Sequence, residues 1–88
     1  MKIGVRYLGE ITSVSVDSSV LQDSVPVLVT RIEDLILNNR TLIIFDLLSA
    51  EYLSSVGLSA IIDLQKQARE SGGDLVLCNA NHLIVNLL

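Results

Sequence analysis

Cysteine, proline and aromatic residues are scarce in this 88-residue chain, which has one cysteine, one proline, one histidine and no tryptophan. The single cysteine, Cys78, excludes a disulfide within the chain, and no cysteine, histidine or carboxylate cluster has metal-site spacing. We therefore expect no metal, no cofactor and a reducing, cytoplasmic location. Cys78 lies in the apolar run 74–79 and is expected to be a small buried core residue.

Positive charge is also scarce, since six basic residues face ten acidic ones and the net charge is −4. The basic residues are scattered in the sequence and form no stripe that would neutralise phosphates, so nucleic acid is not an expected partner. No uncharged stretch approaches the roughly 20 residues that span a bilayer, and the N-terminus lacks an apolar signal core. We expect a soluble protein without direct membrane insertion.

Aliphatic residues are what the chain has in abundance. Half of its residues are hydrophobic but only 3% are aromatic, which predicts one globular domain with a core of leucine, isoleucine and valine. Residues 2–7 and 11–16 alternate polar and apolar side chains around Gly9-Glu10, which predicts a hairpin. Residues 17–22 suit a loop with one short buried or edge strand.

Two helices and two further strands follow. A helix is expected to begin near residues 23–26 and to end at Asn38-Asn39, with an inward face of Leu28, Ile32, Leu35 and Ile36. Residues 41–48 are apolar on both faces, which predicts a central strand covered on both sides.

The second helix begins after Ser54-Ser55 and ends at Gly72-Gly73. Its expected inward residues are Leu58, Ile61, Ile62, Leu64 and Ala68. A buried strand over 74–79 comes next, and residues 80–88 start a third helical pattern with Leu83, Ile84, Leu87 and Leu88. The order predicts an α/β sandwich with a mixed sheet of four to five strands and flanking helices.

The serine pair Ser54-Ser55 stands where a strand connection becomes a helix N-terminus. By local chemistry either serine can be an N-cap that accepts a bond from a free backbone N–H. A catalytic nucleophile is disfavoured, because there is no Gly-x-Ser-x-Gly elbow and the single His82 has no adjacent carboxylate in a recognisable motif. No phosphate-binding loop is present either, since Gly57 is isolated.

Residues 41–79 resemble the STAS domain of bacterial anti-sigma factor antagonists. In that family a hydrophobic strand ending in aspartate, here residues 42–46, leads to a motif matched by residues 52–58, Tyr-Leu-Ser-Ser-Val-Gly-Leu. The family's helix then ends in a Gly-Gly-like break before a strand, as in residues 71–78, Ser-Gly-Gly-Asp-Leu-Val-Leu-Cys. Family members usually continue past the third helix, so residues 1–88 are expected to be a single STAS-like domain that lacks the usual C-terminal end.

The resemblance implies a regulatory binding module rather than an enzyme. The unphosphorylated domain would bind an anti-sigma factor with serine kinase activity, phosphorylation of Ser55 would release it, and a serine phosphatase would reset the switch. Many members carry aspartate where this chain has Ser54, which makes Ser54 the alternative target. The implied partner-binding residues are Asp46, Ser54, Ser55, Val56, Gly57, Ser59 and Asp63.

Several interpretations stay open at this point. Asp46 is either part of the partner surface or a hydrogen-bonded carboxylate at a strand end. Residues 17–19 are expected in a loop at the same end of the sheet, where partners of such domains often bind. The alternative function keeps the fold without the switch, as a STAS scaffold subunit of a stress-signalling or lipid-transport complex.

Overall fold

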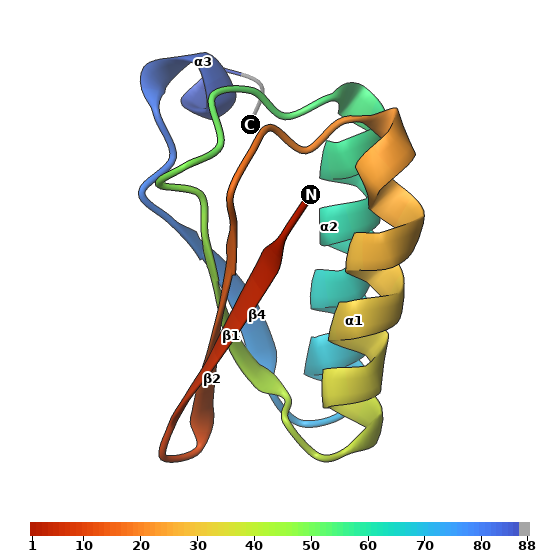
Figure 1. The fold of residues 1–88 in the computed structure, drawn as a ribbon. Coiled ribbons are helices and arrows are strands. Elements are labelled where there is room, and N and C mark those ends of the chain that lie inside the picture. The colour runs from red at the N-terminus through yellow and green to blue at the C-terminus, as the bar shows by residue number, and fades with distance from the viewer. Residues whose placement is uncertain (87–88) are drawn as a thin grey trace.

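The computed structural model describes residues 1–86 and contains four strands, three α-helices and one 3-10 helix (Figure 1). In chain order they are β1 (Ile3–Leu8), β2 (Ile11–Val16), the 3-10 helix η1 (Gln22–Ser24), α1 (Val25–Leu37), β3 (Leu42–Asp46), α2 (Ser55–Glu70), β4 (Asp74–Cys78) and α3 (His82–Val85).

The strands form one mixed sheet in the order β1-β2-β3-β4. β1 pairs antiparallel with β2, and β3 pairs parallel with both β2 and β4. The parallel pairs require crossovers, which α1 and α2 supply. The mixed sheet with flanking helices is confirmed, while the extra strand expected in residues 17–22 is only an isolated bridge between Val20 and Leu53.

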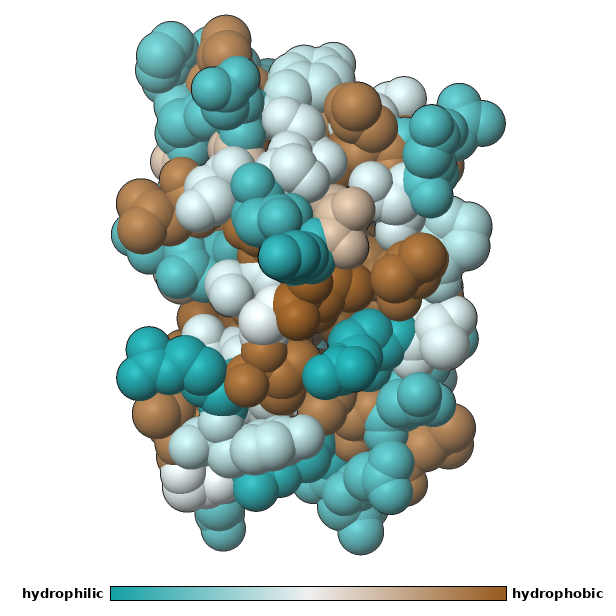
Figure 2. All heavy atoms as spheres, viewed as in Figure 1, coloured by the Kyte–Doolittle hydropathy of each residue, from teal (hydrophilic) through white to brown (hydrophobic). Residues whose placement is uncertain are grey.

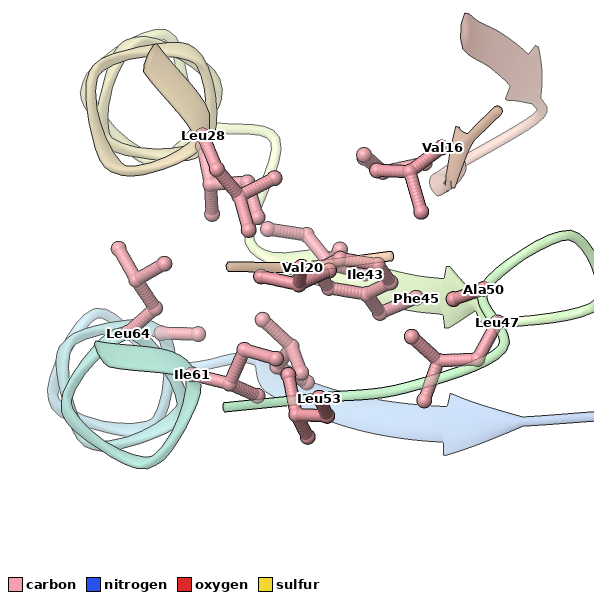
Figure 3. Packing of buried hydrophobic residues seen from close by; sticks show 14 of the residues in the cluster. Val16, Val20, Leu28, Ile43, Phe45, Leu47, Ala50, Leu53, Ile61 and Leu64 are labelled. Atoms are coloured by element: carbon pink, nitrogen blue, oxygen red, sulfur yellow. The ribbon is translucent and has the colours of Figure 1, made fainter. Parts of the chain in front are cut away.

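The core lies between the sheet and the two long helices, which pack side by side on one face of the sheet (Figure 1). Alternate residues of the strands point toward the helices, among them Ile43 and Phe45, and meet Leu28 of α1 and Ile61 of α2 (Figure 3). Each of these four side chains is at most 2% exposed. Full burial of such a side chain contributes roughly 1.5–3 kcal/mol, so this layer holds the helices on the sheet.

The opposite face of the sheet carries no helix among residues 1–86, since α3 lies beyond the end of the strands (Figure 1). Leu42 and Val76 point to this face and are 38% and 47% exposed. The prediction that residues 41–48 are covered on both sides is therefore wrong. Cys78 lies on the same face and is half-buried rather than a core residue.

The helix predictions are largely confirmed. All four expected inward residues of α1 are buried, and its C-cap is Asn38. In α2, Ile61, Leu64 and Ala68 are buried and Leu58 packs against the core, but Ile62 is 54% exposed, so its inward assignment is wrong. In α3, Ile84 is buried and Leu83 is exposed, while Leu87 and Leu88 lie outside the described residues.

Hydrophobic residues also reach the surface. Figure 2 shows several of them at the middle of the face on which β1 and α1 lie side by side, next to strongly hydrophilic residues.

Candidate functional site

The segment that leads into α2 is held by backbone pairing with residues 19–20. Val20 N donates to Tyr52 O at 3.0 Å, and Ser54 N donates to Val20 O at 2.9 Å. Tyr52 N also donates to Ser19 Oγ at 3.1 Å. These bonds confirm that the loop around residue 19 lies beside the approach to the serine pair, and they fix the position of the α2 N-terminus.

The two serines occupy different positions at this N-terminus. Ser54 is the N-cap, with extended backbone angles, and its Oγ accepts a hydrogen bond of 3.0 Å from Gly57 N. Ser55 is the first residue of the 16-residue helix; it is exposed, and its hydroxyl has no hydrogen-bond partner among the described residues. The capping role is thus assigned to Ser54, and Ser55 presents a free hydroxyl to solvent.

Backbone N–H groups beside Ser55 are also available. The first four amides of a helix lack acceptors within the helix. At α2 the Gly57 amide bonds to Ser54 Oγ and the Leu58 amide to Ser54 O, whereas the amides of Ser55 and Val56 bond to no described residue. A negative group on Ser55 would lie next to these two donors and to the positive end of the helix dipole.

The exposed surface of α2 continues from Ser55. Ser55, Ser59 and Asp63 recur at intervals of four residues and therefore share one helix face, on which all three are exposed. Val56 is 45% exposed beside them. Ile62 belongs to this exposed surface as well; sequence analysis missed it because its helical spacing also fits an inward position.

Gly57 faces the opposite way and is buried. A Cβ at this position would lie 3.0 Å from Leu53 Cδ1 and 3.0 Å from Val20 Cγ1. The absence of a side chain therefore lets α2 approach the bridge between Val20 and Leu53. Gly57 therefore lies on the buried side of α2, where it allows close packing against Val20 and Leu53, and is not part of the exposed surface.

Asp46 makes contacts away from the serine pair. Its Oδ1 accepts hydrogen bonds from Leu48 N at 2.9 Å and Asn79 Nδ2 at 3.0 Å, and these bonds hold the pKa of the carboxyl below its usual value, with the Asn79 bond the larger cause. Asp46 also lines a surface hollow with Ser15 and Asp17. The structure thus gives Asp46 the hydrogen-bonded strand-end role and shows no contact that joins it to Ser55.

Within residues 1–86, no group of three or more histidine, cysteine or acidic residues is arranged to hold a metal ion. The same residues include no helix with the length and apolar character needed to span a bilayer. The polar groups described at the candidate site are the hydroxyls of Ser55 and Ser59, the free amides of Ser55 and Val56, and, two turns along the same face, the carboxylate of Asp63.

A mixed four-stranded sheet with two crossover helices on one face, and a serine at the start of the second helix, defines a small α/β domain. The family model for the STAS domain matches residues 2–87, so the chain belongs to the STAS domain family. No curated protein matches the chain in sequence.

Solved structures share this fold. A protein from Thermotoga maritima, described as a candidate anti-sigma factor antagonist, superimposes with a TM-score of 0.92 at 16% identity over 98% of this chain and 74% of that one. The anti-sigma factor antagonist SpoIIAA in its unphosphorylated form superimposes with a TM-score of 0.83 at 13% identity, over 99% of this chain and 81% of SpoIIAA. An anti-sigma factor antagonist from Mycobacterium paratuberculosis superimposes with a TM-score of 0.73 at 23% identity, over 86% of this chain and 66% of that protein. At these identities the similarity establishes the fold.

Proposed function

We propose that this STAS domain is a regulatory protein-binding module that acts as an anti-sigma factor antagonist. In this proposal it binds an anti-sigma factor with serine kinase activity through the N-terminal half of α2. Phosphorylation of Ser55 releases that partner, and a serine phosphatase restores binding. The domain itself carries out no reaction. The observation that carries the proposal is the exposed, unbonded hydroxyl of Ser55 at the first position of α2.

Ser55 suits phosphorylation better than Ser54. Ser54 is partly buried and its Oγ is engaged in the cap bond from Gly57 N, so it presents its hydroxyl to a kinase less openly than Ser55 does. Modifying Ser55 breaks no hydrogen bond between described residues and brings up to two negative charges beside the free amides of Ser55 and Val56. The folded domain therefore tolerates a phosphate on Ser55.

The same phosphate changes the docking surface. Ser55 shares an exposed face with Val56, Ser59 and Ile62, where apolar and hydroxyl groups alternate. A doubly charged group at its edge must be desolvated on docking, or it meets a like charge on the partner. A penalty of about 3 kcal/mol corresponds to a change of roughly 100-fold in affinity, which is sufficient for a switch.

The test uses an anti-sigma factor with serine kinase activity from the same genome. After incubation with that kinase and ATP, intact-mass measurement should show one phosphate on the wild type and on Ser54→Ala, and none on Ser55→Ala. Phosphate on Ser55→Ala would contradict the assignment.

Calorimetric titration of the same partner measures the switch. Ser55→Ala should bind as the wild type does, and Ser55→Asp should bind at least about tenfold more weakly. Ser71→Asp adds the same charge at the opposite end of α2 and should bind normally. Equal binding by all four proteins would instead favour the non-switching scaffold subunit.

A further inference from the structure

The edge strand β1 has an unpaired side that the proposed function does not use. In an antiparallel ladder, residue pairs that are hydrogen-bonded to each other alternate with pairs that are not. The bond from Asp17 N to Lys2 O shows that Lys2 belongs to a hydrogen-bonded pair, and so does every second residue of β1 after it. Gly4 and Arg6 therefore bond to β2, while the backbone N–H and C=O groups of residues 3, 5 and 7 point away from the sheet. No described strand lies beyond β1, so these groups form an open edge.

A groove runs beside this edge, between β1 and α1. Its walls include Ile3 on the strand and Val27 on the helix, and Val27 is 57% exposed. Arg31 and Asp34 also line it and are shared with an adjoining hollow that reaches Tyr7 and Arg40. The hydrophobic surface between β1 and α1 in Figure 2 belongs to this region.

Positive charge gathers around the same edge, although the chain as a whole is acidic. Four of the six basic residues lie on β1, next to it, or in the groove, namely Lys2, Arg6, Arg31 and Arg40. Arg6 alternates with Tyr7 and so points to the uncovered face of the sheet, whereas Arg31 and Arg40 flank the groove.

Among the described residues, the carboxylates near this edge form no salt bridge with its four basic residues. Asp34 lines the groove and Asp17 bonds to the backbone of Lys2, but neither forms a salt bridge there; within residues 1–86 the only salt bridge joins Arg69 and Asp74. Arg40 is held by Gly9 O and lies 4.6 Å from the centre of the Tyr7 ring. Neither contact neutralises its charge, and Glu10 lines the next hollow with it without forming a salt bridge.

We propose that β1 is a second docking site, which takes an extended acidic segment of a partner protein as an added strand. The segment would pair with the free backbone groups of Ile3, Val5 and Tyr7 and place alternate apolar side chains in the groove. Because successive side chains of a strand point to opposite sides, the acidic residues between the apolar ones would face Arg6 on the uncovered side. On the groove side, an acidic residue next to the apolar ones would face Arg31 and Arg40.

The positive charge at the β1 edge favours an acidic strand over a second copy of the chain or a nucleic acid. A second copy of the chain pairing through its own β1 would bring Lys2 and Arg6 of both copies together beside Arg31 and Arg40, and like charges at this spacing oppose association. A nucleic acid would satisfy the arginines but would leave the backbone edge and the apolar groove wall unused. An acidic strand satisfies all three features.

The experiment records amide NMR spectra of the full chain during titration with a short capped valine–glutamate peptide. On one face of the extended peptide lie two valines and then a glutamate, for the groove and Arg31, and on the other face lie glutamates, for Arg6. The amides of Ile3, Val5 and Tyr7 should shift and exchange more slowly with solvent, because they gain acceptors. The amides of Gly4 and Arg6, which already bond to β2, should keep their exchange rates. A valine–lysine peptide of equal length should bind at least about tenfold more weakly.

Two substitutions test the groove and the edge separately. Arg31→Glu should weaken the valine–glutamate peptide about tenfold, and Lys66→Glu, the same charge change on α2, should leave it unchanged. Val5→Pro removes the central outward N–H and should abolish binding; if this variant does not fold, Arg31→Glu still decides the matter. Ser55→Asp should bind the peptide normally, which separates this site from the proposed switch.

Three results would overturn the inference. They are unchanged amides at residues 3, 5 and 7 at saturating peptide, equal binding of the lysine peptide, and tighter binding of oligothymidylate to the same edge. The last would identify the edge as a nucleic-acid site.

Discussion

The hydroxyl of Ser54 accepts a hydrogen bond of 3.0 Å from the backbone amide of Gly57, and this contact separates the roles of two adjacent serines. Ser54 stabilises the start of α2, whereas Ser55, one residue later, has an exposed hydroxyl without a described partner. A chemically similar pair thus divides into a structural residue and a candidate regulatory residue.

Alanine substitution should distinguish the two serines by stability. Ser54→Ala loses the cap and should lower the free energy of unfolding by about 1 kcal/mol. Ser55→Ala removes no described hydrogen bond and should stay within about 0.5 kcal/mol of the wild type. Urea denaturation followed by circular dichroism measures both. A larger loss of stability for Ser55→Ala than for Ser54→Ala would show that Ser55, and not Ser54, caps the helix.

Gly57→Ala should destabilise the domain by about 1 kcal/mol, because overpacking, which costs about 1–3 kcal/mol, outweighs the gain in helix propensity of about 1 kcal/mol. The added methyl would press on Leu53 and Val20, and its distance to Val20 O would be only 3.1 Å. Ser59→Ala on the exposed face of the same helix is the control and should be neutral or slightly stabilising. A Gly57→Ala protein as stable as the wild type would mean that α2 can move away from the bridge freely.

The sequence was most informative where one local pattern determines the structure. The spacing of Leu28, Ile32, Leu35 and Ile36 predicted the buried face of α1, because any helix with that spacing has one apolar side. Gly72-Gly73 ended α2 as expected, for two separate reasons. Gly72 adopts a φ of 89°, and a Cβ on Gly73 would collide with the Thr41 carbonyl.

Long-range features were not predictable in this way. The apolar character of residues 41–48 indicates a strand, but it does not show that both crossover helices lie on the same face. Likewise, Arg6 and Arg31 are far apart in the sequence and come to the same edge of the sheet, on opposite sides of it, only because the hairpin places β1 beside α1. The candidate site at Ser55 came from a family resemblance, and the exposure of Ile62 emerged only from the packing of α2.

The uncovered sheet face leads to a matched pair of predictions for adjacent residues of β4. Leu75 is 0% exposed, and Leu75→Ala should cost about 2–5 kcal/mol. Val76 is 47% exposed, and Val76→Ala should cost less than about 1 kcal/mol. Thermal or urea unfolding of the two variants checks this contrast. Similar losses for both would show that the face is covered.

Asp46 predicts a pH dependence with a defined sign. Because its folded-state pKa lies below the ordinary value of 3.8, the carboxylate contributes stability above about pH 3.8 that is lost as the pH falls through the folded-state pKa. Asn79→Gly removes the main cause, the side-chain amide, and preserves the backbone because glycine tolerates the φ of 58° at this position. Carbon NMR titration of the Asp46 carboxyl should show a midpoint below 3.8 in the wild type and a higher one in Asn79→Gly. Equal midpoints would show that Asn79 does not stabilise the carboxylate.

Cys78 should react slowly despite its partial exposure. Burial raises the pKa of its thiol, and the negative charge of Asp46 raises it further, so little reactive thiolate forms near neutral pH. Iodoacetamide should therefore alkylate the folded protein more slowly than the urea-unfolded chain. Asp46→Asn removes the repelling charge and should accelerate the reaction of the folded protein, while Asp63→Asn on α2 serves as a control and should not. Because burial is the larger cause, Asp46→Asn should remain slower than the unfolded chain; a rate equal to that of the unfolded chain would mean that Cys78 is not protected by the sheet.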